Sequence, residues 1–199
     1  MADLEKTRKN LEGRGFRVHR FATGAEAADY LVQTLHGTSI GIGGSVTIDT
    51  LGVYDRLCGS NEVFWHWKNH APETRERAGK AETYLCSANG VSENGEIVNI
   101  DGFGNRVAGT IYGPERVFLV VGRNKIAPDL TGAIDRARNI AAPLNARRLN
   151  RHTPCAVGEP RCHDCRSPEK ICGVMTVFFM PPTSIKEFHV ILVDEDLGY

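Results

Sequence analysis

Four cysteines lie close together near the carboxyl end of the chain, and their spacing suits the binding of an inorganic centre. The stretch TPCAVGEPRCHDCRSPEKIC spaces them as C-x6-C-x2-C-x6-C, and the four are Cys155, Cys162, Cys165 and Cys172. A C-x-x-C pair lets two thiolates converge on one centre, and the flanking thiolates can complete a set of four ligands. Prolines interrupt the segment and prevent a continuous helix, so we expect a loop over 151–173 that folds around its ligand.

Among the possible occupants of this loop, the spacing favours a 4Fe–4S cluster. A structural zinc ion usually takes two separated C-x-x-C pairs, and only one such pair is present. A cluster spans more space than a single ion and accommodates widely spaced single cysteines. Zinc is the alternative, with His152 or His163 able to replace one thiolate. Two disulfides are a third possibility, which a reducing compartment disfavours.

A glycine-rich loop, GIGGSVT, follows an expected buried strand and precedes an expected helix. Glycines let a ligand approach backbone N–H groups closely, and the hydroxyl groups of Ser45 and Thr47 add donors. In open α/β sheets, ligands bind beyond the carboxyl ends of the strands, where this loop falls. Val46 stands where a dinucleotide-binding fingerprint needs glycine. We therefore expect Gly43, Gly44, Ser45 and Thr47 to bind a small anion, with an ordinary tight turn as the alternative.

A second group of polar residues follows an expected hairpin. The segment NIDGFGNR supplies Asn99, Asp101, Asn105 and Arg106, and Lys125 follows a buried strand. A carboxylate, an arginine and a lysine beside a glycine loop suit a small phosphorylated or carboxylated metabolite. We predict Asp101 and Lys125 as the catalytic acid or base and the other three as ligand-binding residues. The alternative role of Asp101 and Asn99 is an Asx turn.

Alternating strands and helices must position these residues. Strands are expected over 16–21, 39–42, 63–67, 83–88, 91–100 (a hairpin with Asn94-Gly95 at its turn), 116–121, 174–180 and 188–193. Helices are expected over 4–11, 23–35 (capped by Thr23), 72–81 and 129–140, with further helices after the glycine loop and from Pro143. This order predicts an α/β fold with a mixed sheet in three layers, from which the cysteine loop is an excursion.

Length and charge limit the possible functions. The chain has 199 residues, and 24 Lys and Arg balance 24 Asp and Glu, so there is no net charge. A balanced charge argues against nucleic acid as a partner, and no run approaches the roughly 20 apolar residues of a membrane helix. The opening MADLEKTRKN has no apolar run suited to a signal peptide. We therefore expect one domain over 1–199 in a cytoplasmic protein that does not bind membranes.

Other residues carry weaker signals. Cys58 and Cys86 stand alone in apolar contexts and are expected to be buried small residues rather than reactive thiols. Trp65 and Trp67 alternate with His66, which is typical of a strand face. Four arginines are expected to form a solvated face: Arg136, Arg138, Arg147 and Arg148.

Taken together, several segments resemble the LUD domain, the family that includes lactate utilization proteins. The matching segments are GGSVT (43–47), NGEIVNIDGFGNRVA (94–108), GPERVFLVVGRNKI (113–126), AAPLNARRL (141–149), TPC…CHDCRSPEKIC (153–172) and the final LGY. The resemblance implies the fold shared by ribose-5-phosphate isomerase, glucosamine-6-phosphate deaminase and CoA transferases. In that fold a glycine-serine-threonine loop holds the phosphate of the ligand, and GGSVT occupies the corresponding place.

The resemblance also implies a function. Members of the family are associated with the oxidation of lactate to pyruvate in a complex that contains iron–sulfur subunits. The four-cysteine segment departs from lactate utilization protein C and resembles a standalone branch, which favours a redox role for this chain. We expect an iron–sulfur protein that takes part in the oxidation of a small organic acid, with redox partner proteins. The alternatives are a non-redox enzyme, similar to a sugar-phosphate isomerase or acyl transferase with a structural zinc, and an assembly subunit with a degenerate ligand site.

Overall fold

A six-stranded parallel sheet forms the centre of the molecule. The computed structural model describes residues 2–199. Every pairing in this sheet is parallel, in the order β1-β10-β7-β4-β2-β3. The strands are β1 (Arg17–Phe21), β2 (Ser39–Ile42), β3 (Glu62–Trp65), β4 (Thr83–Ser87), β7 (Arg116–Gly122) and β10 (Glu187–Val193). The long apolar strands β7 and β10 lie inside the sheet, where both of their faces are covered, as expected for parallel strands.

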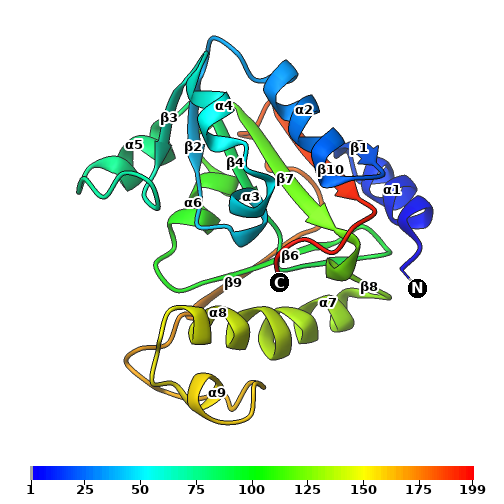
Figure 1. Ribbon diagram of the computed structural model, residues 1–199. Helices are drawn as coiled ribbons and strands as arrows, with labels where there is room; N and C mark the ends of the chain where they lie inside the picture. Colours follow the sequence, from blue (N-terminus) through cyan, green and yellow to red (C-terminus); the bar gives the residue numbers. More distant parts are fainter. Residues whose placement is uncertain (1) are drawn as a thin grey trace.

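Helices cover both faces of this sheet (Figure 1). On one face lie α2 (Gly24–Thr34), α3 (Val46–Leu51) and α4 (Tyr54–Cys58). On the other face lie α1 (Leu4–Gly13), α5 (Thr74–Lys80) and α6 (Asn105–Ile111). Each face has its own apolar core, and alternate residues of β7 contribute to the two: Phe118 packs with Leu31 of α2, and Leu119 packs in the core that contains Leu11 of α1. The α/β class is therefore confirmed.

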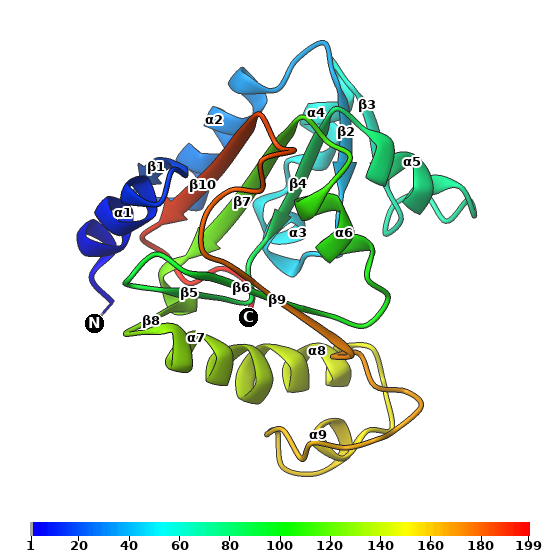
Figure 2. The ribbon, with the colours of Figure 1, turned by 180° about the vertical axis from the view of Figure 1, so that it is seen from behind.

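A second, four-stranded sheet lies beside the first and carries a long helix on its outer face (Figure 2). Its order is β8-β5-β6-β9, with β5–β6 and β6–β9 antiparallel and β5–β8 parallel. The strands are β5 (Gly90–Ser92), β6 (Ile97–Asp101), β8 (Ile126–Ala127) and β9 (Val174–Phe178). Parallel and antiparallel pairing are thus both present, divided between two sheets. The second sheet and its helix add a layer to the three that we expected.

The hairpin between β5 and β6 turns at Asn94-Gly95, as predicted. Gly95 has a φ of 90°, and a Cβ on this residue would lie 2.8 Å from the backbone of Asn10 in α1. Both the conformation and the close approach require glycine at this position.

The helix on the second sheet differs from its prediction. We expected one helix over 129–140 and a second beginning at Pro143. The structure has a single run of α7 (Leu130–Arg136), a π-helical turn (Ala137–Ala141) and α8 (Ala142–Arg148). A proline inside an α-helix removes one hydrogen bond and clashes with the preceding turn. The wider π-helical turn just before Pro143 accommodates this defect, so the helix continues.

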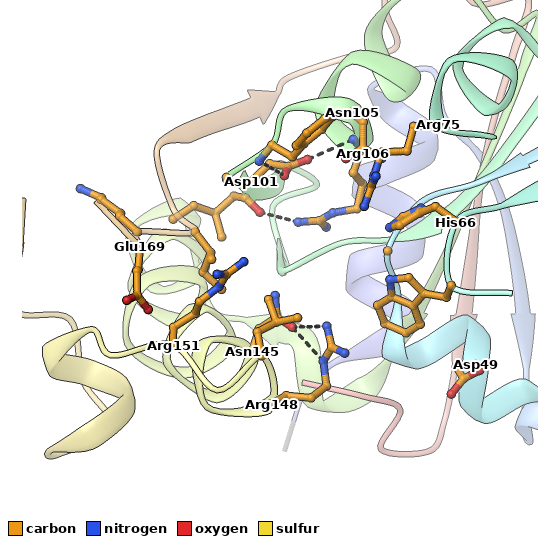
Figure 3. A pocket seen from close by; sticks show the side chains of 18 of the residues that line it. Asp49, His66, Arg75, Asp101, Asn105, Arg106, Asn145, Arg148, Arg151 and Glu169 are labelled. Carbon is orange, nitrogen blue, oxygen red and sulfur yellow. Dashed lines mark hydrogen bonds between the residues drawn. The ribbon is translucent and has the colours of Figure 1, made fainter. Parts of the chain in front are cut away.

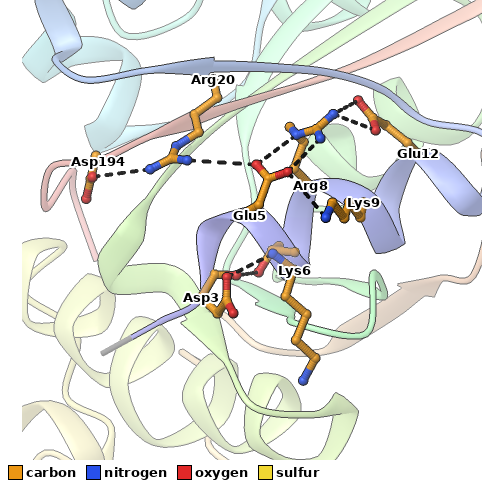
Figure 4. A network of polar contacts seen from close by, with 9 residues as sticks. Asp3, Glu5, Lys6, Arg8, Lys9, Glu12, Arg20 and Asp194 are labelled. Atoms are coloured by element: carbon orange, nitrogen blue, oxygen red, sulfur yellow. Dashed lines mark hydrogen bonds and ion pairs between the residues drawn. The ribbon is translucent and has the colours of Figure 1, made fainter.

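The helix α1, near the start of the chain, is capped by a neighbouring side chain and carries several ion pairs on its surface (Figure 4). The Asp3 side chain accepts a hydrogen bond from the Lys6 N–H at 2.9 Å. Arg8 pairs with Glu5 and Glu12, and Arg20 of β1 lies 3.9 Å from Glu5. Exposed ion pairs of this kind are screened by solvent and contribute little stability, so the apolar side of α1 fixes its position.

The cysteine loop, residues 151–173, follows α8 and returns to β9. It contains one short helix, α9 (Pro154–Val157), and otherwise no regular structure. Within residues 2–199, no helix combines the length and the apolar character needed to cross a membrane.

Candidate functional site

Three strands of the parallel sheet end around a small recess. β2 runs into Gly43, β4 into Ala88, and β7 through a 3-10 turn into Lys125. Parallel strands bring their carboxyl ends to the same edge of the sheet, which is where ligands bind in open α/β sheets. The recess has a volume of about 50 Å³. Its polar walls are Ser45, Thr47, Ser87, Asn89, Arg106, Lys125, Asn145 and Tyr199.

Lys125 lies at the bottom of the recess and is 2% exposed. Its Nζ donates to Thr47 Oγ1 and Ser87 Oγ, both at 2.8 Å, and to the Ala88 carbonyl at 3.2 Å. Both hydroxyl protons are already used, because Thr47 donates to a carbonyl at 3.2 Å and Ser87 donates to another at 2.6 Å. The three contacts therefore suit a protonated amine with three N–H donors. Burial, together with the nearby Arg136 and Arg106, lowers the pKa of Lys125 to about 7.

Arg106 forms a side wall of the recess and is held by neutral acceptors. Its Nη1 donates to Asn99 Oδ1 at 2.9 Å and to the Ser87 carbonyl at 3.3 Å. Its Nη2 donates to Asn89 Oδ1 at 2.9 Å and to the carbonyl of Ile100. Amides and carbonyls from β4, β6 and the segment between them thus fix the guanidinium plane without neutralising its charge.

Arg136 lies behind this pair and is only 7% exposed, so its expected place on a solvated face is wrong. Its guanidinium donates to the carbonyls of Asn124, at 2.7 Å, and Asn89. None of the cations Lys125, Arg106 and Arg136 has a carboxylate within 4.0 Å among residues 2–199. A buried charge without a counter-charge costs several kcal/mol, so the recess is a strongly positive site that favours an anion.

The structure brings the predicted glycine-loop residues to this recess. Gly43 allows close packing, because a Cβ there would lie 3.0 Å from the Tyr84 hydroxyl and 3.1 Å from Arg106 Cγ. Gly44 lines the recess, and Ser45 caps α3 by accepting from the Ile48 N–H at 3.2 Å. Thr47, as described above, holds Lys125.

Asp101, Asn99 and Asn105 lie next to Arg106 but do not line the recess. Asp101 accepts from the N–H groups of Phe103 at 3.1 Å, Arg106 at 3.0 Å and Val107 at 3.2 Å. The Asx-turn arrangement is therefore present, and the carboxyl group accepts hydrogen bonds from the first backbone N–H groups of α6. This helix was not predicted from the sequence. Asn99 is fully buried with its Nδ2 unpartnered, and Asn105 begins α6.

The recess opens into a cleft of about 830 Å³ (Figure 3). Gly44, Trp67, Arg106 and Asn145 line both spaces. The view shows Asp101, Arg75 and Arg106 on one side and Asn145, Arg148 and Arg151 on the other. The cleft therefore runs between α6 and the carboxyl end of α8, with the recess at its inner end.

Two buried polar atoms on these walls have no partner among residues 2–199. One is the hydroxyl of Tyr199, which lines the recess, and the other is Nδ1 of His66, which lines the cleft. Burial, and to a lesser degree Arg75, lowers the pKa of His66. Buried polar atoms are normally satisfied, so both atoms are available to a ligand.

The four cysteines of the loop line one cavity of about 300 Å³, here called the cysteine cavity. All four are free thiols, so the disulfide alternative is wrong. Cys162 Sγ accepts from Arg138 Nη2 and from the Asp164 N–H, both at 3.4 Å. No three Cys, His, Asp or Glu side chains within residues 2–199 lie close enough to hold a metal ion. The sulfurs therefore surround a volume instead of meeting at one point.

The cysteine cavity shares a wall with the cleft. Ile100 and Lys170 line both spaces, and 168–171, between the third and fourth cysteines, borders the cleft. The segment packs closely, since a Cβ on Gly102 would lie 2.6 Å from Ile171 Cα. The glycine loop and the cysteine loop thus contribute to neighbouring sites.

Several site residues were not predicted from sequence. Trp67 lines the recess and the cleft, and the Arg148 guanidinium lies 4.5 Å from the centre of its ring. Trp67 and Arg148 are residue types that often bind ligands, but they lie far apart in the sequence. No spacing pattern predicted that they would meet. Of the two remaining cysteines, Cys86 is buried as expected and Cys58 is exposed.

Comparisons with known proteins agree with this description. The family model of the LUD domain matches residues 4–193. A crystal structure of a DUF162 family protein from Deinococcus radiodurans is similar, with a TM-score of 0.56, 14% sequence identity, and coverage of 96% of this chain and 95% of that chain. An identity this low shows a shared fold alone. None of the curated proteins matches the sequence.

Proposed function

Because the chain belongs to the LUD domain family, we propose that it takes part in the oxidation of a small organic acid, as a lactate utilization-like iron–sulfur protein. In this proposal the recess holds the carboxylate or phosphate of the substrate. The four cysteines of the loop hold a 4Fe–4S cluster, and the electrons pass to redox partner proteins.

The observation that carries the proposal is a set of three cations: Lys125 and the half-buried Arg106, which line the recess, and the buried Arg136 behind them. Lys125, Arg106 and Arg136 face neutral acceptors only, in a space lined by hydroxyl and amide groups. A carboxylate or phosphate in the recess would supply the counter-charge that the protein itself does not. The same arrangement would exclude cations and would give little affinity to a neutral ligand.

The cysteine cavity fits a cluster better than a single zinc ion. Four thiolates on one zinc ion lie about 2.3 Å from the metal and therefore close to one another. The four thiols here surround a space of about 300 Å³ and have no tight grouping of three. N–H groups of Arg138 and Asp164 already point at Cys162 Sγ, and such hydrogen bonds tune the potential of a cluster. When bound, a cluster of this kind supplies one-electron transfer.

Within the cleft, the protein's own residues would bind the acid and take up its proton. Arg106 and Lys125 would fix the anionic group at the inner end of the cleft. Oxidation of a hydroxy acid removes two electrons and two protons. Because a protonated Lys125 binds the anion and cannot also accept a proton, Asp101, which lines the cleft, would accept the hydroxyl proton, and the proton of the C–H bond would pass to solvent. The cysteine cavity adjoins the cleft, so a cluster held there would lie beside the substrate.

Purification without oxygen, followed by cluster reconstitution, tests the redox half of the proposal. We expect about four iron and four sulfide per chain, a broad absorbance that reduction bleaches, and loss of both in Cys162→Ser. Colourless, iron-free protein after reconstitution would refute it. Titration with lactate and with sulfate tests the anion half, and affinity should fall at least tenfold in Lys125→Met.

One observation favours a second candidate, a non-redox enzyme similar to a sugar-phosphate isomerase or acyl transferase. A lysine with a pKa near 7 in a phosphate-sized recess suits general acid–base chemistry. In that case the loop would hold stoichiometric zinc. Turnover of a sugar phosphate by the zinc-loaded, iron-free protein would decide for this candidate.

A further inference from the structure

The cleft is much larger than a small organic acid needs. At about 830 Å³ it lies near the top of the roughly 300–1,000 Å³ range of pockets that bury drug-sized ligands. The recess, at about 50 Å³, has room for a single anionic group. A three-carbon acid anchored in the recess would therefore leave most of the cleft filled with water.

The outer part of the cleft is also positively charged. Arg75 and Arg148 have no carboxylate within 4.0 Å among the residues described by the structure. The acids on the walls are already engaged. Asp49 pairs with Lys68 at 3.0 Å, and Asp101 accepts a hydrogen bond from the backbone N–H of Arg106 at the start of α6. The remaining acid, Glu169, accepts from the N–H of His152 at 2.8 Å.

Arg148 is held in place without losing its charge. Its Nε and Nη2 donate to Asn145 Oδ1 at 3.0 and 2.8 Å, and its guanidinium lies over the Trp67 ring at 4.5 Å. Asn145 and Trp67 also line the recess. An arginine fixed by an amide and an aromatic ring loses little conformational entropy when it binds an anion. Arg148 is therefore preorganised for anion binding.

Part of the cleft lining is apolar. Phe103 is 76% exposed and has the Arg75 guanidinium 5.0 Å from its ring centre. Ile100, Leu149 and Ile171 complete this stretch of the lining. These side chains can contact the uncharged part of a ligand that carries more than one anionic group.

We infer that the ligand of this site is an elongated organic dianion with one anionic group in the recess on Lys125 and Arg106 and a second on Arg148. This inference rests on the proposed anion site and revises the substrate proposed above from a small acid to a larger one with two anionic groups. Acids with a single carboxylate and a short body would fill the recess alone and would bind weakly.

Calorimetric titration with two matched ligand series tests the inference. The probes are alkanediyl bisphosphates from propane to octane, each compared with the alkyl monophosphate of equal chain length. We expect at least one bisphosphate to bind about tenfold more tightly than its monophosphate, beyond the statistical factor that two equivalent ends give. Arg148→Gln should abolish this gain and leave the monophosphate affinity within about twofold.

Arg147→Gln is the matched control. It removes the same charge from the same helix, but Arg147 donates to the carbonyls of Ala156 and Gly158 and does not line the cleft. This variant should keep the bisphosphate gain, and unfolding curves should show that all variants are folded.

The outcomes distinguish a failure of the proposed anion site from a failure of the elongated-dianion inference. If Lys125→Met leaves monophosphate binding unchanged, the proposed anion site is wrong. If monophosphates bind through Lys125 but no bisphosphate exceeds its match, the elongated-dianion inference is overturned. A gain that survives in Arg148→Gln overturns it as well.

Discussion

Raising the pH from 6 to 8 should weaken anion binding at the recess, because Lys125 would lose its proton over this range. Burial lowers the pKa of Lys125 to about 7, with Arg136 and Arg106 adding to the effect. Sulfate is a suitable probe because its own charge is constant between these pH values. The three acceptors around Nζ suit the protonated amine, which is the form that attracts an anion.

The size of the effect follows from the pKa. With a value of about 7, roughly nine-tenths of the amine is protonated at pH 6 and roughly one-tenth at pH 8. Sulfate affinity should therefore fall about tenfold, which corresponds to about 1.4 kcal/mol. Near pH 7, binding should also take up about half a proton, because the anion raises the pKa of Lys125.

Isothermal titration calorimetry in buffers of different ionisation enthalpy measures both quantities. Other polar side chains also line the cleft, so a variant must isolate the share of Lys125. Lys125→Met keeps the length of the side chain and removes the amine. It should bind sulfate more weakly at pH 6 and lose most of the change in affinity between pH 6 and pH 8. Lys186→Met, which removes an exposed lysine paired with Glu115, is the matched control.

The same shift predicts how stability changes with pH. Lys125 has an ordinary pKa of 10.5 in the unfolded chain and about 7 in the fold, so between these values the unfolded state binds more protons. The cost of the buried charge is therefore fully present below pH 7 and disappears as the pH rises to 10.5. Its upper bound is about 5 kcal/mol, and Lys125→Met should raise the free energy of unfolding at pH 6 by up to this amount.

Equal sulfate affinity at pH 6 and pH 8, with no proton uptake, would refute this reasoning. So would a Lys125→Met variant that is no more stable than the wild type at pH 6. Either result would mean that Lys125 keeps its proton throughout, and that the neutral acceptors offset the cost of burial.

Three further predictions concern the frame of the site. Asp101→Ala should lower the free energy of unfolding by about 1–2 kcal/mol in urea titrations, because three N–H groups at the start of α6 lose their acceptor; an unchanged midpoint would contradict this. Gly41→Ala should prevent folding, as judged by circular dichroism, since its Cβ would lie 1.9 Å from the carbonyl of Ala78. By contrast, Gly79→Ala in α5 meets nothing within 4 Å and should stabilise by about 0.5–1 kcal/mol. In cluster-free protein, iodoacetamide should modify Cys86 last among the six thiols, by mass spectrometry, because burial raises its pKa to about 12.

The sequence by itself determined the local features of this protein. Thr23 and Ser45 cap helices by bonds that span three residues, and Asn94-Gly95 makes a hairpin turn with its immediate neighbours. The apolar run of β7 indicated a strand buried on both faces. Signals of this kind lie within a few residues or in a simple period, so they can be detected without knowing the fold. The glycine loop belongs to the same class, since its position after β2 predicted that it lies at the ends of the parallel strands, where it lines the recess.

Only the tertiary structure decided which distant residues share the site. Arg136 is buried because α7 packs on the second sheet and two backbone carbonyls accept its N–H groups, an arrangement that no periodicity encodes. Arg148 reaches Trp67 across a long stretch of chain, and the cysteine loop returns to form a wall of the cleft. Burial and long-range packing depend on the whole fold, whereas caps, turns and strand patterns depend on neighbours.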